Sequence, residues 1–366
     1  MSQQAISVIN IGCRLNQAEG DALAGLPLVA FAQLFKSTPR AVYIVNTCAV
    51  TETAVNSSLK AIKRIIKHKS SIQGAGGRLI VTGCLTALAQ IKLSELNGVD
   101  LVLSHHKKLS LLKGGHFSVS TRARPIIKIQ DGCINECTFC IARLIRGKTK
   151  SVPIENVLNK IKNITDLGYQ EIVLSGLNLG LYGVDLGGRR IIKKRKLPDD
   201  TFRIRLSSIQ PEAISDELLT LWQDKKICRH LHIPLQSGDD KILRLMRRKY
   251  SANDYRRKIE MVIKKIPGVN IGCDIIVGFP YEDEPAFLNT VKLIEDLPFG
   301  YLHIFPYSKR PFTTATTLPD TVSPEVKKAR LKVLKEIDKK KRQTFYNKFV
   351  NTQMEVLVEN NAYGLT

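Results

Sequence analysis

The sequence of 366 residues has no apolar run long enough to cross a membrane. The longest, residues 24–35, is well short of the roughly 20 apolar residues that a spanning helix needs, and no signal-peptide pattern adjoins it. Acidic residues are also scarce, with 33 Asp and Glu against 56 Lys and Arg, so the formal net charge is +23. This excess favours a polyanionic partner, and nucleic acid is a better candidate than a membrane surface.

The three cysteines that lie closest together in the sequence have no fourth metal ligand beside them. Of eight cysteines, Cys133, Cys137 and Cys140 lie together in DGCINECTFC, with no further Cys or His close by. Structural zinc needs four ligands, whereas a [4Fe-4S] cluster on three thiolates keeps one iron open for a small molecule. The spacing therefore predicts a catalytic cluster. Chance clustering and a zinc site completed from far away are the alternatives.

A second group of three cysteines follows three β-rich runs in the first hundred residues. The runs alternate with helical stretches, which is typical of a parallel α/β sheet, and cover 6–12, 41–47 and 78–83. Cys13, Cys48 and Cys84 each come directly after one run. Because parallel strands end at one edge of their sheet, the three thiols are expected to converge on a second site. The alternative is that they are ordinary buried cysteines.

Residues 125–308 alternate between strands and helices again. The expected strands are 125–130, 171–176, 202–208, 230–236, 269–279 and 301–307. Six such units predict a partial TIM-type (β/α)6 barrel, in which chemistry gathers on the loops at the carboxyl ends of strands. The loop with Cys133, Cys137 and Cys140 is the first of these loops.

The last block begins with a long basic helix, expected over 324–349. Its cations are Lys327, Lys328, Arg330, Lys332, Lys335, Lys339, Lys340, Lys341 and Arg342. An alternating run at 354–359 looks like the first strand of a β domain, and only seven residues follow it. One strand cannot form a sheet, so a truncated β domain is expected. The basic runs, including 189–196, have a plainer interpretation as solvated surface.

The cysteine-rich loop closely resembles that of the radical S-adenosylmethionine superfamily, down to Phe139 before the last cysteine. Other segments resemble one family within it, the methylthiotransferases: GCRLNQAEGD, VNTCAVTETA, VTGCL, RLSSIQP, HIPLQSGDD, DIIVGFP and HIFPYSKRP. The sequences of these segments are most similar to those of the branch that acts on N6-threonylcarbamoyladenosine in tRNA. The resemblance implies a flavodoxin-like parallel α/β domain over 1–115, a radical SAM partial barrel with the basic helix over 120–349, and a truncated TRAM-like β start over 350–366.

The resemblance also implies a mechanism with two [4Fe-4S] clusters and S-adenosylmethionine. The cluster on Cys133, Cys137 and Cys140 would generate the radical that takes hydrogen from C2 of the adenine at tRNA position 37. A cluster on the other three cysteines would carry the sulfur, and a second S-adenosylmethionine would donate the methyl group. The implied partners are the anticodon loop of tRNA and an electron donor such as a flavodoxin or ferredoxin, in the cytoplasm. The sulfur donor and any catalytic residue beyond the cluster ligands stay unassigned.

Further cofactor contacts follow from motif positions alone. The candidates, at strand ends or beside the cysteines, are Phe139, Ser175, Gly176, Ser207, Gln236, Ser237 and Gly278. Each has an alternative as an ordinary loop polar group or turn glycine. Cys228 and Cys273 match neither group of three and are expected to be buried thiols.

Four features depart from the family pattern. Residues 21–40 lack the expected amphipathic helix, the gap from Leu186 to Arg203 is too short for a crossover helix, Phe312 replaces a glycine, and the β domain is cut short. Three alternatives to threonylcarbamoyladenosine modification stay open, and the four departures motivate the last of them. They are isopentenyladenosine in tRNA as the substrate, a ribosomal-protein side chain as the substrate, and a non-catalytic basic RNA-binding remnant.

Overall fold

The computed structural model describes residues 6–71, 77–88, 92–112, 122–187, 202–360 and 363–365. The chain forms two compact units, the first from 1–121 with 140–147 and the second from 122–139 with 148–366. No helix in the described ranges is both long and apolar enough to cross a membrane. The basic run 189–196 lies outside the described residues.

The first unit is built on a parallel sheet with strand order β1-β2-β3-β4. The strands are β1 (Ile6–Asn10), β2 (Ala41–Thr47), β3 (Gly77–Gly83) and β4 (Leu101–Leu103). The three runs expected from the sequence are confirmed. The fourth strand was missed because three residues are too few to show a periodicity.

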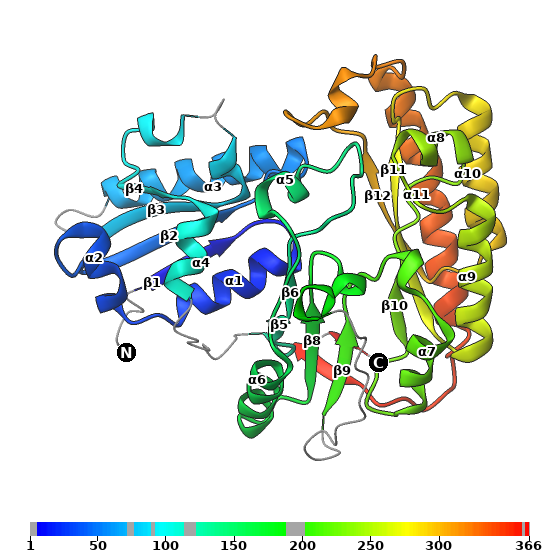
Figure 1. Cartoon of the computed structure of the whole chain (residues 1–366), viewed down its shortest axis with the longest axis horizontal. Coiled ribbons are helices and arrows are strands. Elements are labelled where there is room, and N and C mark those ends of the chain that lie inside the picture. The colour runs from blue at the N-terminus through cyan, green and yellow to red at the C-terminus, as the bar shows by residue number, and fades with distance from the viewer. Residues whose placement is uncertain are drawn as a thin grey trace. The chain divides into compact units, whose positions relative to one another are not determined.

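Helices cover both faces of this sheet (Figure 1). On one face α3 (Glu52–Ser71) packs Ile62 against Val45 and Val81. On the other face Leu23 and its apolar neighbours meet the sheet, and the elements there are α1 (Arg14–Ala24), η1 (Leu28–Phe31), α2 (Ala32–Phe35) and α4 (His105–Leu111). The unit is therefore the expected α/β fold with a parallel sheet between two helical layers.

Residues 21–40 contain no long helix beyond the end of α1, as noted from the sequence, but the helix expected after Cys13 is present and begins before them. Helix α1 begins at Arg14 and buries Leu15, Ala18 and Leu23 against the sheet. Its close approach depends on Gly20, where a Cβ atom would lie only 1.6 Å from Asn10 Oδ1. The apolar periodicity of this helix is weak in the sequence, because its buried face also carries polar residues. The hydrogen-bond partners of these residues are far away in the sequence.

The second unit contains six parallel strands in two groups, β5-β8-β9 and β10-β11-β12. They are β5 (Ile126–Lys128), β8 (Glu171–Ser175), β9 (Arg203–Leu206), β10 (His230–His232), β11 (Asn270–Val277) and β12 (Tyr301–Pro306). Parallel bridges from Ile204 to Ile227 and from Ser208 to His232 join the groups. All six expected strands and the partial (β/α)6 barrel are confirmed.

Helices pack outside the barrel strands (Figure 1). The main ones are α6 (Ile154–Asp166), α9 (Ala252–Lys265), α10 (Glu284–Asp296) and α11 (Pro324–Asn347), with the shorter α7 (Asp216–Leu219) and α8 (Asp240–Leu245). Between β8 and β9 the described residues form only the short helices η5 (Leu179–Leu181) and η6 (Val184–Leu186). The gap from Leu186 to Arg203 noted in the sequence lies almost wholly outside the described residues.

Helix α11 confirms the expected basic helix, but its cations have different roles. Arg330 is buried and pairs with Glu282 and Glu284, and Lys341 Nζ donates to the carbonyl oxygens of Glu295 and Leu297. These two side chains hold α11 on the barrel. The cations that face solvent are Lys328, Lys332, Lys335, Lys339 and Lys340.

The C-terminal prediction of a single strand was wrong. Strand β13 (Leu357–Asn360) pairs with β14 (Tyr363–Leu365) in an antiparallel hairpin. Two residues are enough to connect antiparallel strands, so the few residues after the alternating run suffice for a partner strand.

Phe312 occupies a backbone position suited to glycine, with φ of 67° and a side chain that is 66% exposed. We predict that Phe312→Gly raises the free energy of unfolding by about 1 kcal/mol, because glycine adopts this left-handed conformation without the Cβ strain. Urea denaturation of the purified protein measures the change. Phe312→Ala is the matched control, since it removes the ring but keeps Cβ, and an equal gain in that variant would contradict the explanation.

Glu171 is a fully buried carboxylate at the start of β8. Arg203 Nε and Arg205 Nε each donate to it at 2.6 Å. Burial alone would raise the pKa of Glu171, but the hydrogen bonds and charges of the two arginines outweigh it and hold the pKa below its ordinary value of 4.5. The carboxylate therefore stabilises the folded unit above that pH and loses this contribution as the pH falls through the folded-state pKa.

We predict that Glu171→Gln lowers the free energy of unfolding at pH 7 by about 3 kcal/mol, since it leaves buried guanidinium groups without their counter-charge. The difference from the parent protein should shrink as the pH falls below about 4.5 and then through the lower folded-state pKa, where the parent carboxylate itself becomes protonated. Denaturant titrations at a series of pH values test both points. Glu217→Gln, on the exposed side of α7, should change stability by less than about 0.5 kcal/mol.

Candidate functional site

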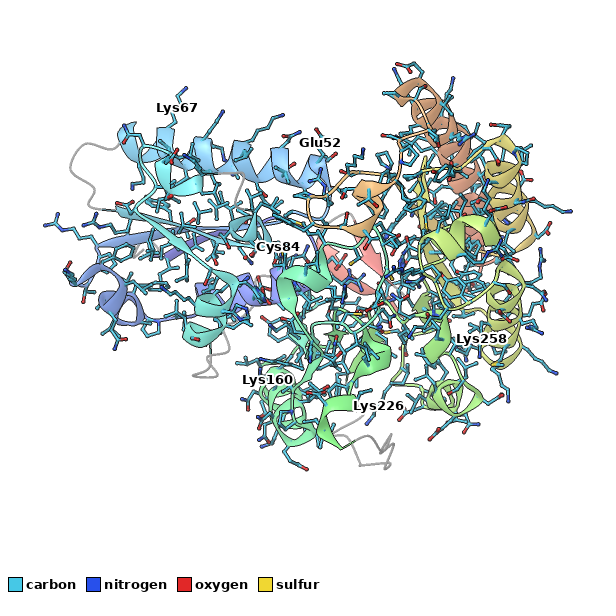
Figure 2. The ribbon with its side chains drawn as sticks, turned by 45° about the horizontal axis from the view of Figure 1, so that its top comes forward. Glu52, Lys67, Cys84, Lys160, Lys226 and Lys258 are labelled. Carbon is cyan, nitrogen blue, oxygen red and sulfur yellow. The ribbon has the colours of Figure 1, made fainter. Side chains whose placement is uncertain are left out.

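Three cysteines of the first unit lie at the carboxyl ends of adjacent strands. Cys13 precedes α1, Cys48 directly follows β2, and Cys84, labelled in Figure 2, directly follows β3. The strands end level with one another, because Asn10 pairs with Asn46 and Thr47 pairs with Gly83. These three thiols therefore share one edge of the sheet, as expected from the sequence.

Two glycines leave room at this edge. At Gly12, with φ of 95°, a Cβ atom would lie 2.5 Å from Cys48 Sγ. At Gly83, with φ of 96°, a Cβ atom would lie 2.3 Å from the carbonyl oxygen of Thr47. No larger residue fits either position without moving a cysteine or its strand. Each of these glycines directly precedes a cysteine in the sequence, and this pairing could have predicted the constraint. The sequence analysis did not use it.

Two of these thiols are buried in surroundings that keep them protonated when no metal is bound. Cys48 is 1% exposed and Cys84 is 2% exposed. Burial raises the pKa of Cys48 to about 12, and the neighbouring Cys84 and Cys13 add to the rise. Burial also raises the pKa of Cys84, against the opposing charges of Arg146 and Lys108. Binding of a metal cluster to these thiols would therefore release protons.

A buried charge network lies beneath the same edge, and sequence reasoning missed it. Glu19 accepts hydrogen bonds from Lys108 Nζ at 2.5 Å and from Arg146 Nη1 at 2.9 Å. Arg146 Nη2 also donates to Asn16 Oδ1 at 2.9 Å. The charges of Arg146 and Lys108 favour the thiolate form of Cys84, and the charge of Glu19 opposes it.

The other group, Cys133, Cys137 and Cys140, lies on the loop between β6 (Gln130–Asp131) and α5 (Ala142–Arg146). In the second unit, Cys133 Sγ accepts a hydrogen bond from Asn178 Nδ2 at 3.8 Å, and Cys137 Sγ accepts one from Arg248 Nη1 at 3.2 Å. Cys140 begins the segment that belongs to the first unit. All three thiols are partly exposed, so the loop offers them to a ligand.

Two of the candidate cofactor residues carry unsatisfied hydroxyl groups. Ser175 ends β8 and Ser207 follows β9, and both side chains are almost fully buried. Their Oγ atoms have no hydrogen-bond partner within the described part of the chain. A buried hydroxyl without a partner costs free energy unless a ligand or water satisfies it.

Gly176 permits a contact between two loops. A Cβ atom at this position would lie 2.7 Å from Gln130 Oε1, which accepts a hydrogen bond from the backbone N–H of Asn178 at 2.9 Å. Gln130 Nε2 donates to the carbonyl oxygen of Gly132 at 2.6 Å. Gln130 thus ties the loop after β8 to the cysteine loop. It was not predicted, because its partners are distant in the sequence.

The remaining candidates have local structural contacts. Gln236, with φ of 72°, continues the pairing of β10 with β11 through its backbone. Ser237 Oγ accepts from the N–H of Asp239, and the N–H of Gly278 donates to Glu282 Oε1. Phe139 packs against the apolar cluster that contains Phe279. These contacts fit the alternative of ordinary turn residues and exclude no ligand contact.

Cys228 and Cys273 are 7% and 0% exposed and lie in the second unit, where Cys273 belongs to the main apolar core. Neither forms a disulfide. The prediction of buried thiols is confirmed for both.

Comparisons with known proteins agree with this arrangement. The family model described as "Radical SAM superfamily" matches residues 127–294, and that described as "Uncharacterized protein family UPF0004" matches residues 5–104. Among solved structures, the radical S-adenosylmethionine methyltransferase TsrM from Kitasatospora setae is similar with a TM-score of 0.56, over 78% of this chain and 67% of that chain. At 12% sequence identity this likeness shows the fold alone.

Curated relatives are similar over nearly the whole chain. The threonylcarbamoyladenosine tRNA methylthiotransferase MtaB of Aquifex aeolicus is 34% identical, with 95% of this chain and 91% of the relative covered. The protein of that name from Bacillus subtilis is 33% identical, with 95% and 83% covered. The tRNA-2-methylthio-N(6)-dimethylallyladenosine synthase of Acetivibrio thermocellus is 30% identical, with 95% and 79% covered. The chain therefore belongs to the radical S-adenosylmethionine tRNA methylthiotransferases, enzymes that use S-adenosylmethionine and [4Fe-4S] clusters.

Proposed function

We propose that this protein adds a methylthio group to C2 of N6-threonylcarbamoyladenosine at position 37 of tRNA. The observation that carries the proposal is the pair of cysteine triads, one at the strand ends of the α/β sheet and one on the first barrel loop. The choice of nucleoside is supported by relatives named for threonylcarbamoyladenosine, which are 33–34% identical, whereas those named for dimethylallyladenosine are 30% identical.

We assign one cluster to each triad. Three thiolates without a fourth protein ligand suit a [4Fe-4S] cluster with an open iron. Cys133, Cys137 and Cys140 would hold the cluster that binds S-adenosylmethionine, and the strand-end triad would hold the second. When bound, the clusters and S-adenosylmethionine supply the radical and sulfur chemistry. The strand ends accommodate such a group because Gly12 and Gly83 carry no Cβ atom.

The chain's own residues orient these ligands. Asn178 and Arg248 donate hydrogen bonds to the thiols of Cys133 and Cys137, which fixes the directions of the sulfur atoms. Lys108 and Arg146 place positive charge near the second triad. Ser175 and Ser207 offer hydroxyls without a partner in the described part of the chain to S-adenosylmethionine, and Gly176, packed against Gln130, is proposed to contact it through its backbone. Phe139, Gln236, Ser237 and Gly278 complete the proposed cofactor contacts.

The tRNA is expected to meet the exposed cations of α11. Lys328, Lys332, Lys335, Lys339 and Lys340 face solvent and can neutralise phosphates along an extended surface. An anticodon loop presents its adenosine already in a single-stranded context, where a base can enter a pocket at low cost. A tRNA substrate places the activity in the cytoplasm, with a flavodoxin or ferredoxin as the proposed electron donor.

The decisive experiment is nucleoside mass spectrometry of tRNA from cells that have and lack this gene. We expect 2-methylthio-N6-threonylcarbamoyladenosine only when the gene is present. A methylthiolated isopentenyladenosine instead, or a methylthiolated ribosomal protein with unchanged tRNA, would reassign the substrate. Unchanged tRNA and ribosomal proteins would favour a non-catalytic RNA-binding protein.

Cysteine variants separate the two proposed clusters. After anaerobic reconstitution, Cys48→Ala should retain about four of eight irons and still cleave S-adenosylmethionine to 5′-deoxyadenosine, but form no methylthio product. Cys137→Ala should also retain about four irons but lose the cleavage, because the cluster that binds S-adenosylmethionine is missing. Cys228→Ala is the control, with about eight irons and both activities. Loss of cleavage in Cys48→Ala would argue against separate roles.

Arg248 provides a second test of the barrel cluster. In the Cys48→Ala background, which isolates that cluster, Arg248→Met should slow S-adenosylmethionine cleavage by about 10- to 100-fold and make the reduction potential more negative. The reason is the loss of a positively charged donor to Cys137 Sγ. Redox titration followed by electron paramagnetic resonance measures the potential. Arg244→Met, on the exposed face of α8, should leave both quantities unchanged, and an unchanged potential in Arg248→Met would refute the role.

A further inference from the structure

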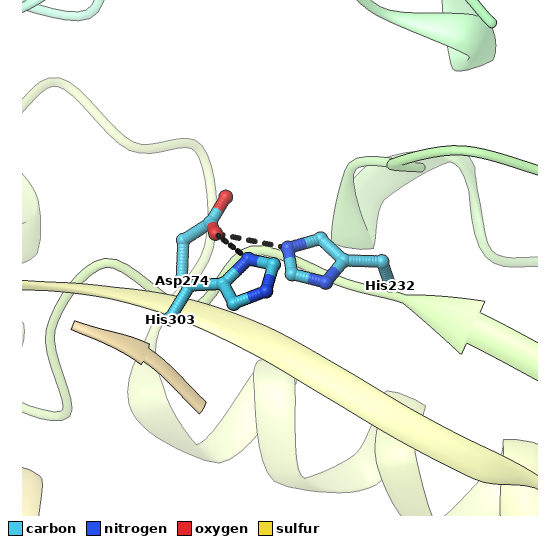
Figure 3. Close-up of side chains that lie close together, drawn as sticks. All are labelled: His232, Asp274 and His303. Atoms are coloured by element: carbon cyan, nitrogen blue, oxygen red, sulfur yellow. Dashed lines mark ion pairs between the residues drawn. The ribbon is translucent and has the colours of Figure 1, made fainter. Parts of the chain in front are cut away.

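Three side chains from adjacent barrel strands converge outside the sites described above (Figure 3). They are His232 on β10, Asp274 on β11 and His303 on β12. His232 Nε2 lies 2.9 Å from Asp274 Oδ1, and His303 Nδ1 lies 3.4 Å from the same oxygen. The three ligand atoms all lie within 4.8 Å of one another. Two imidazoles and one carboxylate at these separations form a set that one metal ion can span.

The strand register produces this convergence. Asp274 pairs with His303, and His232 pairs with Gly272, two residues before Asp274. Side chains alternate between the faces of a strand, so Gly272 and Asp274 point to one face. Ile271, Cys273 and Ile275 point to the other and belong to the core under the helices. The three polar groups therefore share the face of the sheet opposite the helices.

A supporting hydrogen-bond network orients His232. Tyr301 Oη lies 3.0 Å from His232 Nδ1 and 2.9 Å from His230 Nε2. The tyrosine ring reaches across β11 only because residue 272 is glycine, where a Cβ atom would lie 2.0 Å from Tyr301 Cζ. If His232 donates its Nδ1 proton to Tyr301, the Nε2 lone pair points toward Asp274. Metal-binding histidines usually have their second nitrogen engaged in this way.

The three side chains of the triad differ in their exposure, so one side of the triad is open to solvent. The side chain of His232 is 5% exposed, that of Asp274 is 24% exposed and that of His303 is 49% exposed. A metal ion held here would be anchored on its buried side by His232. Its remaining coordination positions would face solvent, as in zinc sites with three protein ligands and a fourth position for water or substrate.

We propose a third metal centre, separate from both cysteine triads, in which one divalent transition-metal ion is bound by His232, Asp274 and His303. Zn²⁺ is the ion best suited to this site. Imidazole with a single carboxylate suits Zn²⁺, Fe²⁺ or Co²⁺ better than Mg²⁺ or Ca²⁺, which take mostly oxygen ligands. The open position would accept an oxygen ligand, either water or a carboxylate. The site shares no residue with those assigned to the proposed function, although the zinc test below uses protein whose cysteines hold the proposed clusters.

The competing explanation is a hydrogen-bonded triad without a metal, in which Asp274 accepts protons from both imidazoles. Zinc binding decides between the two. Protein with both clusters assembled is incubated anaerobically with Zn²⁺ alone and desalted, and zinc and iron are counted by mass spectrometry. The assembled clusters occupy the six cysteines during the incubation. We expect about one zinc per chain with no loss of iron.

Variants locate the bound zinc. His303→Gln, at the exposed member of the triad, and Asp274→Asn should each weaken zinc binding at least tenfold with the iron content unchanged. His106→Gln removes an exposed histidine of α4 and should bind zinc like the parent. Tyr301→Phe keeps all three ligands and should weaken binding by about 10- to 100-fold, since only the orienting contact is lost.

A cobalt(II) spectrum checks the ligand type. Cobalt at this site should give visible d–d bands without a new thiolate charge-transfer band, and His303→Gln should abolish them. Zinc binding equal in the parent and in Asp274→Asn would overturn the proposal. So would zinc that appears only as iron is lost, because it would then occupy the cysteines.

Discussion

The parallel pairing of strands is the constraint on which both units depend. In a parallel sheet every carboxyl end lies at one edge, so residues that follow different strands are brought together although the sequence separates them. In the first unit this places Cys13, Cys48 and Cys84 at one edge. In the barrel it places Ser175 and Ser207 at neighbouring strand ends. The residues proposed for the two clusters and for S-adenosylmethionine therefore lie where strands stop, and the register decides which of them meet.

Buried charge is the second determinant, and it serves to position the strand ends. Glu19 with Lys108 and Arg146 fastens α1, α4 and the segment after Cys140 within the first unit. Glu171 does the same for Arg203 and Arg205 at the opposite end of β8 from Ser175. Removing one member of such a group is costly because its partners stay buried and charged. These networks therefore fix geometry more than they add stability.

Local patterns predicted much of the fold and of the site. Strand runs followed by cysteine were enough to place Cys48 and Cys84, and short β-rich segments were enough for six barrel strands. The bounds of helix α1 were not predicted, because Asn16 and Glu19 interrupt its apolar face and their partners, Thr47 and Lys108, are far away in the sequence. Arg330 looked like an RNA-binding cation, yet it is buried against Glu282. Periodicity records which face a residue occupies and contains no information about its tertiary partner.

Because periodicity does not identify tertiary partners, the triad of His232, Asp274 and His303 could not be predicted from the sequence. Each residue sits in an alternating strand, where a polar side chain on one face is unremarkable. Only the register of β11 with β12 sets Asp274 opposite His303, and only Gly272 allows Tyr301 to reach His232. A small residue in a strand interior usually weakens the strand, so its presence marks a place where another group must pass. Glycines inside strands, considered together with the polar residues two positions away, are thus a better guide to such sites than the polar residues alone.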